Sequence, residues 1–381
     1  MDLQLSVEEQ ATPAGIKILE IFDILEYSAN MHTLYERLET YSNHVFEPKE
    51  RLIFLYLDTD FVISDIRFNL YNLQLILFKL SIPNFASIII TSQDIEDNLE
   101  NLKRMLTNEV IPISHIRMES HAFLHYHLKT RVDLNENAVE KNYISLANKP
   151  RTHRQFMFSW LRHNELLDKG FVSYLKYVDD DGVEGKSNIS FYPNPNLFLL
   201  TASPHANIND FWFCSDPELM RIFDEDMPNL YKNFTEEQNP KLVGTNQHLI
   251  QRAFCYVSNE TVFNYPCTYT SEKSYKAFGS KRPMISFGSF GILSRLRELG
   301  FRTFSDYWSE DYDDIEDNLL RFKKVAELIK QISNLSIQDC KKMLLDMRPI
   351  LEHNHDLYID NFIVNQKHTL YTEFRNNFLR K

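Results

Sequence analysis

Short apolar runs alternate with segments of helical spacing along the first part of the chain. The apolar runs predict strands at 16–25, 51–57, 86–91 and 110–118. Between these runs, apolar residues recur at helical intervals, which predict helices at 31–41, 69–80 and 95–106. Strands that alternate with helices are typical of a parallel sheet wrapped by helices, so we expect an α/β fold.

A second series of the same kind begins at Asn142, where the run 142–148 predicts a strand. A helix reaching about Lys169 follows it, and the polar, turn-rich segment 179–196 predicts a loop or hairpin insertion. The pattern further along predicts a helix at 246–252 and a strand that ends in Glu260. After these it predicts a short helix carrying Lys276, a buried strand at 283–287 and another helix. The acidic run 309–317 predicts the start of a long helix, since the helix dipole favours negative charge there.

The length of 381 residues is enough for two domains, each with a core of its own. We expect an N-terminal α/β domain at 1–140, a second α/β domain at 141–312, and C-terminal helices at 313–381. The two α/β domains are expected to face each other across a cleft. No internal repeat and no low-complexity tract interrupts this organisation.

The composition of the chain disfavours several classes of protein, among them general nucleic-acid binders and membrane-spanning proteins. Hydrophobic residues at 43% and charged residues at 25% are ordinary for a soluble globular protein. The net charge of -12 argues against a general affinity for nucleic acid or anionic membranes. No apolar run approaches the roughly 20 residues that span a bilayer, so we expect no membrane span and a cytoplasmic location. The four cysteines form no CxxC pair, which disfavours structural zinc and a disulfide framework.

A basic cluster follows the predicted strand at 142–148. Arg151, His153 and Arg154 lie where the next helix begins. Cationic side chains there add to the exposed backbone N–H groups of the helix and suit a diphosphate. The alternative is that the three are solvated surface cations. Basic residues oppose the helix dipole at this end, so their presence needs a reason.

A second charged cluster, Glu272, Lys273 and Lys276, follows the strand that ends in Glu260. The carboxyl ends of parallel strands are where α/β proteins bind ligands. A carboxylate suits a ribose diol, and lysines suit a diphosphate. Glu272 and Lys276 also have the i,i+4 spacing of a surface salt bridge, which is the alternative interpretation.

These residues carry a resemblance. The segment TSEKSYKAFGSKRPMISFGS resembles the donor-binding segment of inverting sugar transferases of the fucosyltransferase type. Together with LRELGFRTFSDYWSEDYDDI, it is similar to uncharacterised glycosyltransferase-like proteins, many of them from phages and bacteria. Their upstream basic element is matched here by Asn148, Arg151, His153 and Arg154. The resemblance covers 142–315, which is under half of the chain.

The resemblance implies a GT-B protein with two Rossmann-like domains, whose C-terminal helices pack back on the N-terminal domain. It implies that Glu272 binds the donor's ribose, that Lys273 or Lys276 binds its phosphates, and that Glu260 lies near the sugar. Arg151 or Arg154, with His153 beside them, would neutralise the leaving diphosphate. Ser274 and Tyr275 depart from the fucosyltransferase pattern, so the transferred sugar is left open.

The implied reaction is an inverting transfer from a nucleotide-sugar to a hydroxyl acceptor, which needs no metal and no further cofactor because fixed cations stabilise the diphosphate. It requires a general base to take the acceptor's proton. Asp58 and Asp60 follow the run 51–57, and His115 and Glu119 lie in or after the run 110–118. Of these we favour Asp60 or Glu119, with Asp58 as a third candidate.

Alternatives remain for metal and acceptor. The Asp58-x-Asp60 pattern is also what metal-dependent sugar transferases use to hold manganese at the diphosphate. His121, His125 and His127 suggest a zinc site, but no Glu stands between the first two as in HExxH. The acceptor is a glycan hydroxyl or, in a phage-encoded protein acting in the host cytoplasm, a hydroxymethylated base of DNA. A non-catalytic nucleotide- or carbohydrate-binding module is the remaining alternative.

Overall fold

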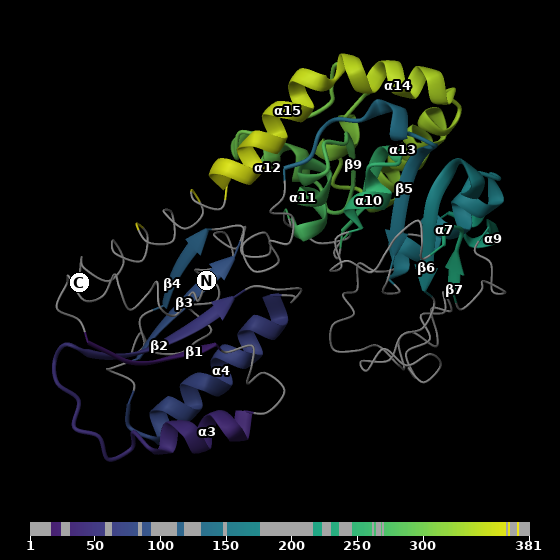
Figure 1. Cartoon of the computed structure of the whole chain (residues 1–381). Coiled ribbons are helices and arrows are strands. Elements are labelled where there is room, and N and C mark those ends of the chain that lie inside the picture. The colour runs from purple at the N-terminus through teal and green to yellow at the C-terminus, as the bar shows by residue number, and fades with distance from the viewer. Residues whose placement is uncertain are drawn as a thin grey trace. The chain divides into compact units, whose positions relative to one another are not determined.

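The computed structural model describes residues 17–23, 31–57, 63–82, 86–92, 113–117, 131–147, 151–175, 216–222, 230–235, 246–260, 263, 268, 270–362, 365 and 372. The chain folds as two compact units (Figure 1). The first unit contains Met1–Leu124 and Ile363–Lys381, and the second contains His125–Phe362. The sequence had placed the boundary at 140 and grouped 313–381 together. In the structure, the chain leaves the first unit at 124, and residues 313–362 belong to the second unit.

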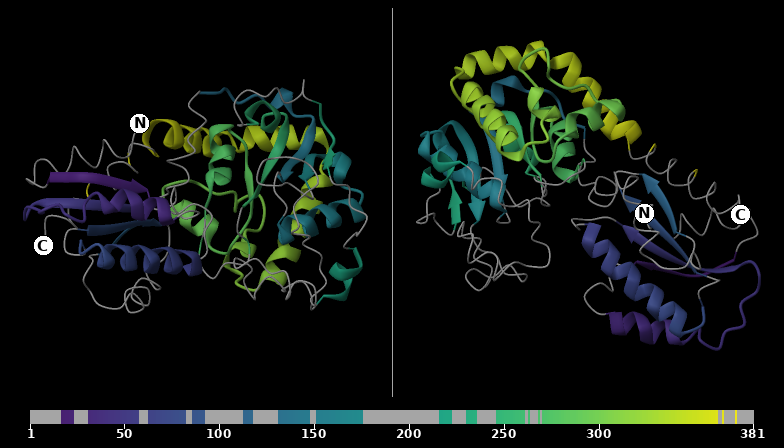
Figure 2. Two further views of the ribbon diagram at one scale, coloured as in Figure 1. Left: turned by 90° about the horizontal axis from the view of Figure 1, so that it is seen from below. Right: turned by 180° about the vertical axis from the view of Figure 1, so that it is seen from behind.

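The first unit contains a four-stranded parallel sheet in the order β1-β2-β3-β4. The strands are β1 (Lys17–Asp23), β2 (Glu50–Leu57), β3 (Ala86–Ser92) and β4 (Ile113–Arg117). Strand order follows chain order, so right-handed crossovers place successive connecting helices on one face. Helices α3 (Met31–Glu39) and α4 (Ile63–Lys79) do lie on the same face (Figure 2).

The core of the first unit forms between this face and the two helices. Phe22 of β1 and Phe54 of β2 stack with their ring centroids 5.0 Å apart. Leucines of both helices pack over them, and the fully buried ones are Leu34, Leu38, Leu73 and Leu77. Ile53 points to the opposite face of β2 and is also fully buried. Both faces of this strand are therefore covered, as is usual for parallel sheets.

The amino end of the same sheet is held by a buried carboxylate. Lys17 Nζ lies 2.7 Å from one oxygen of Glu50, and His44 Nε2 lies 2.8 Å from the other. The backbone N–H of Glu47 donates to the second oxygen at 3.1 Å. These contacts join β1, β2 and the turn before β2 at the edge opposite the strands' carboxyl ends.

The second unit contains a five-stranded sheet in the order β7-β6-β5-β8-β9. Its strands are β5 (Lys141–Ala147), β6 (Gly170–Leu175), β7 (Leu230–Lys232), β8 (Ala253–Asn259) and β9 (Met284–Phe287). All neighbours are parallel except β6 and β7. The chain passes from β5 to β6 on one side and later returns to β8 on the other. The strand order therefore reverses between β5 and β8, which makes this the topological switch point.

Helices cover this sheet. They are α7 (Thr152–His163), α9 (Pro217–Ile222), α10 (Gln247–Ile250), α11 (Glu272–Gly279), α12 (Ile292–Glu298), α13 (Asn318–Ser333), α14 (Ile337–Asp346) and α15 (Arg348–Asp356), which continues into a π-helix (Leu357–Phe362). Helix α13 packs on β5, β9 and α7, whereas α11 packs on β8, β9 and α15. Every residue of β8 and β9 is buried. The two strands are thus covered on both faces.

The α/β class predicted from the sequence is confirmed in both units. The long helix expected at the acidic run 309–317 begins later, at Asn318, with Asp317 as its N-cap accepting from Leu320 N at 2.7 Å. The predicted helix at 95–106 and the polar segment 179–196 lie outside the described residues. Among the residues that are described, no helix has both the length and the apolar character needed to cross a bilayer.

A pH-dependent contribution of Glu50 to stability is the first prediction. Hydrogen bonds from Lys17, from His44 and from the backbone of Glu47 lower the pKa of Glu50 from 4.5 to about 2. A carboxyl group whose pKa is lower in the folded state stabilises the fold above its unfolded pKa, and this contribution is lost as the pH falls through the folded value. Glu50→Gln should therefore lower stability near neutral pH, and the deficit should shrink between about pH 4.5 and pH 2.

Urea unfolding followed by far-UV circular dichroism measures this deficit at several pH values. Glu36→Gln on the exposed surface of α3 is the matched control, because it removes the same charge without a buried partner. A deficit for Glu50→Gln that stays constant across the acidic range would contradict the prediction.

Candidate functional site

The carboxyl ends of β5 and β8 lie side by side at the switch point of the second sheet. Asn259, the last residue of β8, donates from its side-chain amide to Ser145 Oγ at 2.9 Å and to the carbonyl of Leu146 at 3.1 Å. The helix after β5 is α7, and the first helix after β8 is α11. Ligands of open α/β sheets bind between the loops at such a point, so the side chains that begin these two helices define the candidate site.

The start of α7 is fastened to the end of β8. His153 Nε2 donates to the carbonyl of Glu260 at 3.0 Å, and Arg154 Nη2 donates to the carbonyls of Asn259 and Glu260 at 2.9 and 2.8 Å. Both side chains are buried, with exposed fractions of 5% each. Burial, followed by the charge of Arg154, holds the pKa of His153 well below its usual value. His153 is therefore neutral at physiological pH and carries no charge toward a phosphate.

Glu260 is fully buried and its carboxylate accepts from three serines. One oxygen accepts from the hydroxyls of Ser258 and Ser274, the latter at 2.7 Å. The other accepts from the hydroxyl of Ser271 and from its backbone N–H at 3.1 Å. Ser271 is the N-cap of α11, and its Oγ accepts in turn from the N–H of Lys273. The carboxylate thus ties the end of β8 to the first turn of α11.

Glycine and arginine hold the neighbouring loops close to this carboxylate. A Cβ on Gly288, which follows β9, would lie 2.8 Å from both Cβ and Cγ of Glu260. The guanidinium of Arg321 donates to the backbone carbonyls of Gly288, Phe263, Ile315 and Glu316. Burial lowers the pKa of Arg321 to about 10. One buried cation therefore joins the segments that follow β8 and β9 to the start of α13.

The helix after β9 has its N-terminus closed by a carboxylate of the same chain. Asp313 accepts from the backbone N–H groups of Leu293 and Ser294 in the first turn of α12, each at 2.8 Å. The exposed N–H groups of a helix start are what attract an anionic ligand. At α12 they are already occupied, so α12 offers no anion site.

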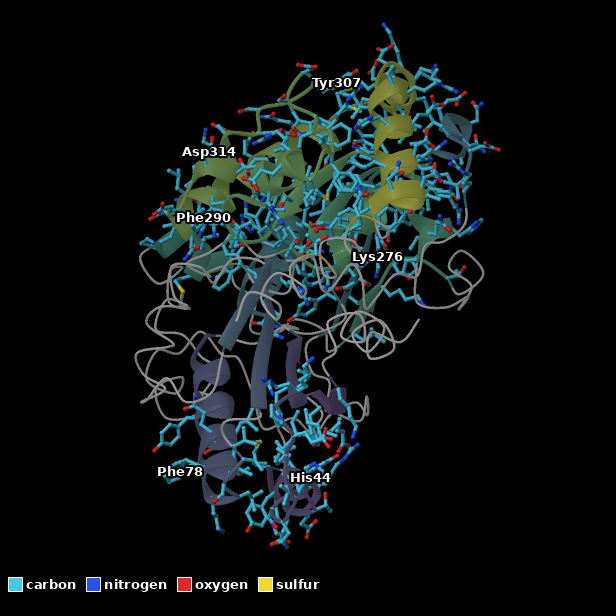
Figure 3. The ribbon with its side chains drawn as sticks, turned by 90° about the vertical axis from the view of Figure 1, so that its left-hand side faces the viewer. His44, Phe78, Lys276, Phe290, Tyr307 and Asp314 are labelled. Carbon is cyan, nitrogen blue, oxygen red and sulfur yellow. The ribbon has the colours of Figure 1, made fainter. Side chains whose placement is uncertain are left out.

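The side chains left for a ligand come from α7 and α11. Arg151 is the N-cap residue of α7 and makes no side-chain cap. Glu272 and Lys273 are half-buried and form an ion pair of 2.9 Å between Nζ and Oε1. Lys276, one turn further along α11, is labelled in Figure 3. Burial lowers the pKa of Lys276, an effect partly offset by the nearby charge of Glu272.

Lys276 lacks a partner within hydrogen-bonding distance in the described part of the chain. Among the residues that the structure describes, no hydrogen bond and no ion pair joins its ammonium group to another side chain. A partly desolvated cation without a hydrogen-bonded partner is unfavourable unless an anion completes it. An anionic ligand at the end of β8 would provide that partner.

The seven donor-site residues predicted from the sequence fall into two groups in the structure: three that bond within the protein, and four whose charged groups are less enclosed. His153, Arg154 and Glu260 use their polar atoms within the protein framework, since each bonds to backbone or serine groups of the same unit. The other four lie at the switch point with their charged groups less completely enclosed, and these are Arg151, Glu272, Lys273 and Lys276. Sequence reasoning missed the serine partners of Glu260. Only Ser271 had a local signal, as a serine that directly precedes a helix.

Asp58, Asp60 and Glu119 lie outside the described residues, as do Asn148 and the histidines at 121, 125 and 127. His115 falls within β4. Within the described ranges, no group of three or more His, Cys, Asp or Glu residues could hold a metal ion.

Comparison with known proteins finds no family model, no curated protein and no solved structure that matches the chain.

Replacing the buried carboxylate is the second prediction. Glu260→Gln presents an amide NH₂ to serine hydroxyls that now donate to a carboxylate oxygen. A buried network with mismatched donors should lose roughly 2–4 kcal/mol of unfolding free energy. Urea unfolding followed by tryptophan fluorescence reports on this unit, because all three tryptophans (Trp160, Trp212 and Trp308) belong to it.

Glu272→Gln is the matched control, since the same change is made at a half-buried ion pair in α11, the helix that Glu260 joins to β8. We expect it to change the unfolding free energy by less than about 1 kcal/mol. If both variants lost the same unfolding free energy, the serine network around Glu260 would contribute no more to stability than a half-buried ion pair does.

Proposed function

We propose that the protein is an inverting glycosyltransferase that moves a sugar from a nucleotide-sugar to a hydroxyl acceptor without a metal ion. The donor binds at the switch point of the second unit, and its diphosphate contacts Lys276 and Arg151. The two α/β units are the two domains of a GT-B enzyme. The resemblance of 270–289 to the donor-binding segment of fucosyltransferase-type enzymes supports the reaction class.

The observation that carries the proposal is the state of Lys276. Its ammonium group is partly desolvated and has no recorded partner among the described residues, and it lies one helical turn from Glu272. A diphosphate supplies the missing negative charge, while the carboxylate of Glu272 accepts from ribose hydroxyls. Arg151 adds a second cation at the uncapped start of α7, where the helix dipole also favours an anion.

These side chains account for the electrostatic part of catalysis. Breaking the bond between the sugar and the diphosphate builds negative charge on the leaving group. Cations that are already in position stabilise this charge in the transition state without reorganising. The framework around Glu260 serves this purpose, because it fixes the first turn of α11 to the end of β8. The acceptor's proton passes to a general base, for which Asp60, Glu119 and Asp58 are the candidates.

Nucleotide binding in the presence of EDTA is the third prediction. We expect one nucleoside diphosphate among UDP, GDP and dTDP, or CMP, to raise the melting temperature of the full chain, and the shift to persist after EDTA is added. A shift that requires manganese would replace this proposal with a metal-dependent transfer through Asp58 and Asp60. Binding without hydrolysis of the matching nucleotide-sugar, and without transfer to any acceptor, would indicate a non-catalytic binding module.

Loss of the Lys276 charge is the fourth prediction. Lys276→Met keeps the apolar stem of the side chain and removes its ammonium group, so affinity for the nucleotide should fall by about ten- to hundredfold. Stability should stay level or increase, since an unpaired, partly desolvated charge is removed. Isothermal titration calorimetry measures the affinity, and Lys342→Met on the exposed side of α14 is the matched control. Unchanged affinity in Lys276→Met would remove this residue from the donor site.

The acceptor is tested separately with hydroxyl compounds of two classes. Transfer to glycans is the first expectation. Transfer to DNA carrying hydroxymethylated bases is the second, and it would also require salt-sensitive binding of the modified duplex despite the acidic net charge of -12.

A further inference from the structure

The chain passes between the two units twice. It enters the second unit at His125 and leaves it after Phe362. Within the described part of the second unit, the segment nearest the entry is 131–134, and the segment nearest the exit is the π-helix Leu357–Phe362. We call them the entry segment and the exit helix. Although they stand at opposite ends of the unit's sequence, side chains join them.

Arg131 makes the outer part of this connection. Its guanidinium donates to the carboxylate of Asp356 at 2.8 Å and to that of Asp360 in the exit helix. All three side chains are about half exposed. Ion pairs at the surface contribute little to stability, so Arg131 alone does not account for a fixed entry segment.

His355 makes the inner part of the connection and is fully buried. Its Nε2 lies 3.3 Å from the backbone N of Val132, and its Nδ1 lies 3.1 Å from the carbonyl oxygen of Phe278 in the last turn of α11. One ring on α15 therefore joins the entry segment to α11. Beyond the entry segment, Arg282 donates to the carbonyl of Asn135 at 3.0 Å, so the chain is held independently of His355 from there onward.

The exit helix packs on α11 through aromatic rings. The ring centroid of Tyr275 in α11 lies 5.9 Å from that of Tyr358 and 4.9 Å from that of Phe362. All three rings are buried. Contacts between buried rings of this kind carry no titrating charge, so the exit helix stays on α11 whatever the protonation state of His355. The entry segment is therefore the part that His355 controls.

Both hydrogen bonds of His355 require the neutral ring. The carbonyl of Phe278 can only accept, so Nδ1 carries the hydrogen. The backbone N–H of Val132 can only donate, so Nε2 offers its lone pair. A proton on Nε2 would place one N–H group against another. Protonation therefore breaks the bond to Val132 and leaves the bond to Phe278 intact.

The groups around the ring disfavour its protonation. Burial lowers the pKa of His355, and the charges of Lys281 and Arg131 lower it further. The bond to the carbonyl of Phe278 and the charge of Asp356 act in the opposite direction. Helix α14 adjoins the first turn of α15, at the other end from His355. A released ring takes up a proton below about pH 6.5, whereas the bonded ring does so only at lower pH, so the connection weakens as the pH falls through that value.

We propose that His355 is a proton-sensitive clasp, whose neutral ring holds the entry segment on α15 and α11 and whose protonated ring releases it. In the neutral state, the fixed part of the chain begins at Arg131. In the protonated state it begins at Asn135, where Arg282 holds the backbone. The entry connection thus gains the freedom of 131–134 at acidic pH, whereas the exit helix stays in place. This proposal is independent of the proposed glycosyl transfer.

Hydrogen exchange at the backbone amide of Val132 in the full chain tests the clasp directly, by mass spectrometry with residue-level fragmentation. Its protection factor, corrected for the intrinsic pH dependence of exchange, should be level above about pH 6.5 and fall by up to about tenfold for each pH unit below it. The reason is that the released ring takes up a proton that the bonded ring excludes. A protection factor that stays constant on acidification, or no protection at any pH, would overturn the proposal.

His355→Gln tests whether this histidine is the titrating group. A glutamine amide both donates and accepts, so it can bond to Phe278 and Val132, but it does not titrate. Protection of the Val132 amide should therefore become independent of pH. His355→Phe removes both bonds, and the same amide should exchange at least about tenfold faster even near neutral pH. Circular dichroism and the melting temperature establish that each variant is folded.

His353→Gln is the matched control. It replaces a histidine of the same helical turn that is bonded instead to the carbonyl of Gly300 at 2.9 Å. This variant should keep the pH dependence of the wild-type chain at Val132. A pH dependence that persists in His355→Gln, or one that disappears in His353→Gln, would assign the effect to another group and overturn the proposal.

Discussion

The carboxylate of Glu260 is the interaction on which the second unit's carboxyl edge depends. It lies at the end of a fully buried strand, and three serine hydroxyls and one backbone N–H satisfy its two oxygens. An ionised group in the interior is tolerated only when it is hydrogen-bonded in this way. Because Ser271 is the N-cap of α11 and Ser274 lies in its first turn, the carboxylate keeps these hydrogen bonds only if the helix starts at this place. The position of Lys276 follows from this constraint.

The choice of hydroxyls as partners has an electrostatic consequence. If a lysine or arginine formed an ion pair with Glu260, that cation would no longer be available to bind an anionic ligand. Arg154 instead donates to backbone carbonyls. The charge of Glu260 raises the pKa of Lys276, but it is the smallest of the contributions to that pKa. The carboxylate of Glu260 is thus satisfied by neutral donors, and the positive charge of Lys276 remains at the switch point. Asp313, in contrast, closes the start of α12, so the attraction for anions is confined to α7 and α11.

The α/β class and the position of charged residues at the carboxyl edge of the second sheet were predictable from local patterns. Strands alternate with segments whose apolar residues recur at helical intervals, as Leu73 and Leu77 do, and this alternation indicated parallel sheets. Charged residues that directly follow strands indicated the carboxyl edge of a sheet. The role of Glu260 was not predictable, because its partners Ser271 and Ser274 are 11 and 14 residues away and no periodicity connects them. His153 and Arg154 illustrate the same limit, since the carbonyls that they bind are more than a hundred residues away in the chain. Basic residues at a helix start look alike in sequence whether they face a ligand or a neighbouring strand.

Helix α4 extends the same reasoning to the first unit. Its inner leucines were visible as a helical repeat, whereas the outer row was not recognised, because apolar residues on both faces cancel the amphipathic pattern that marks a surface helix. Only the exposed fractions of Tyr71, Leu75 and Phe78 separate the two faces. Packing in the core requires the inner face alone, so core stability gives no reason for aromatic residues on the outer one.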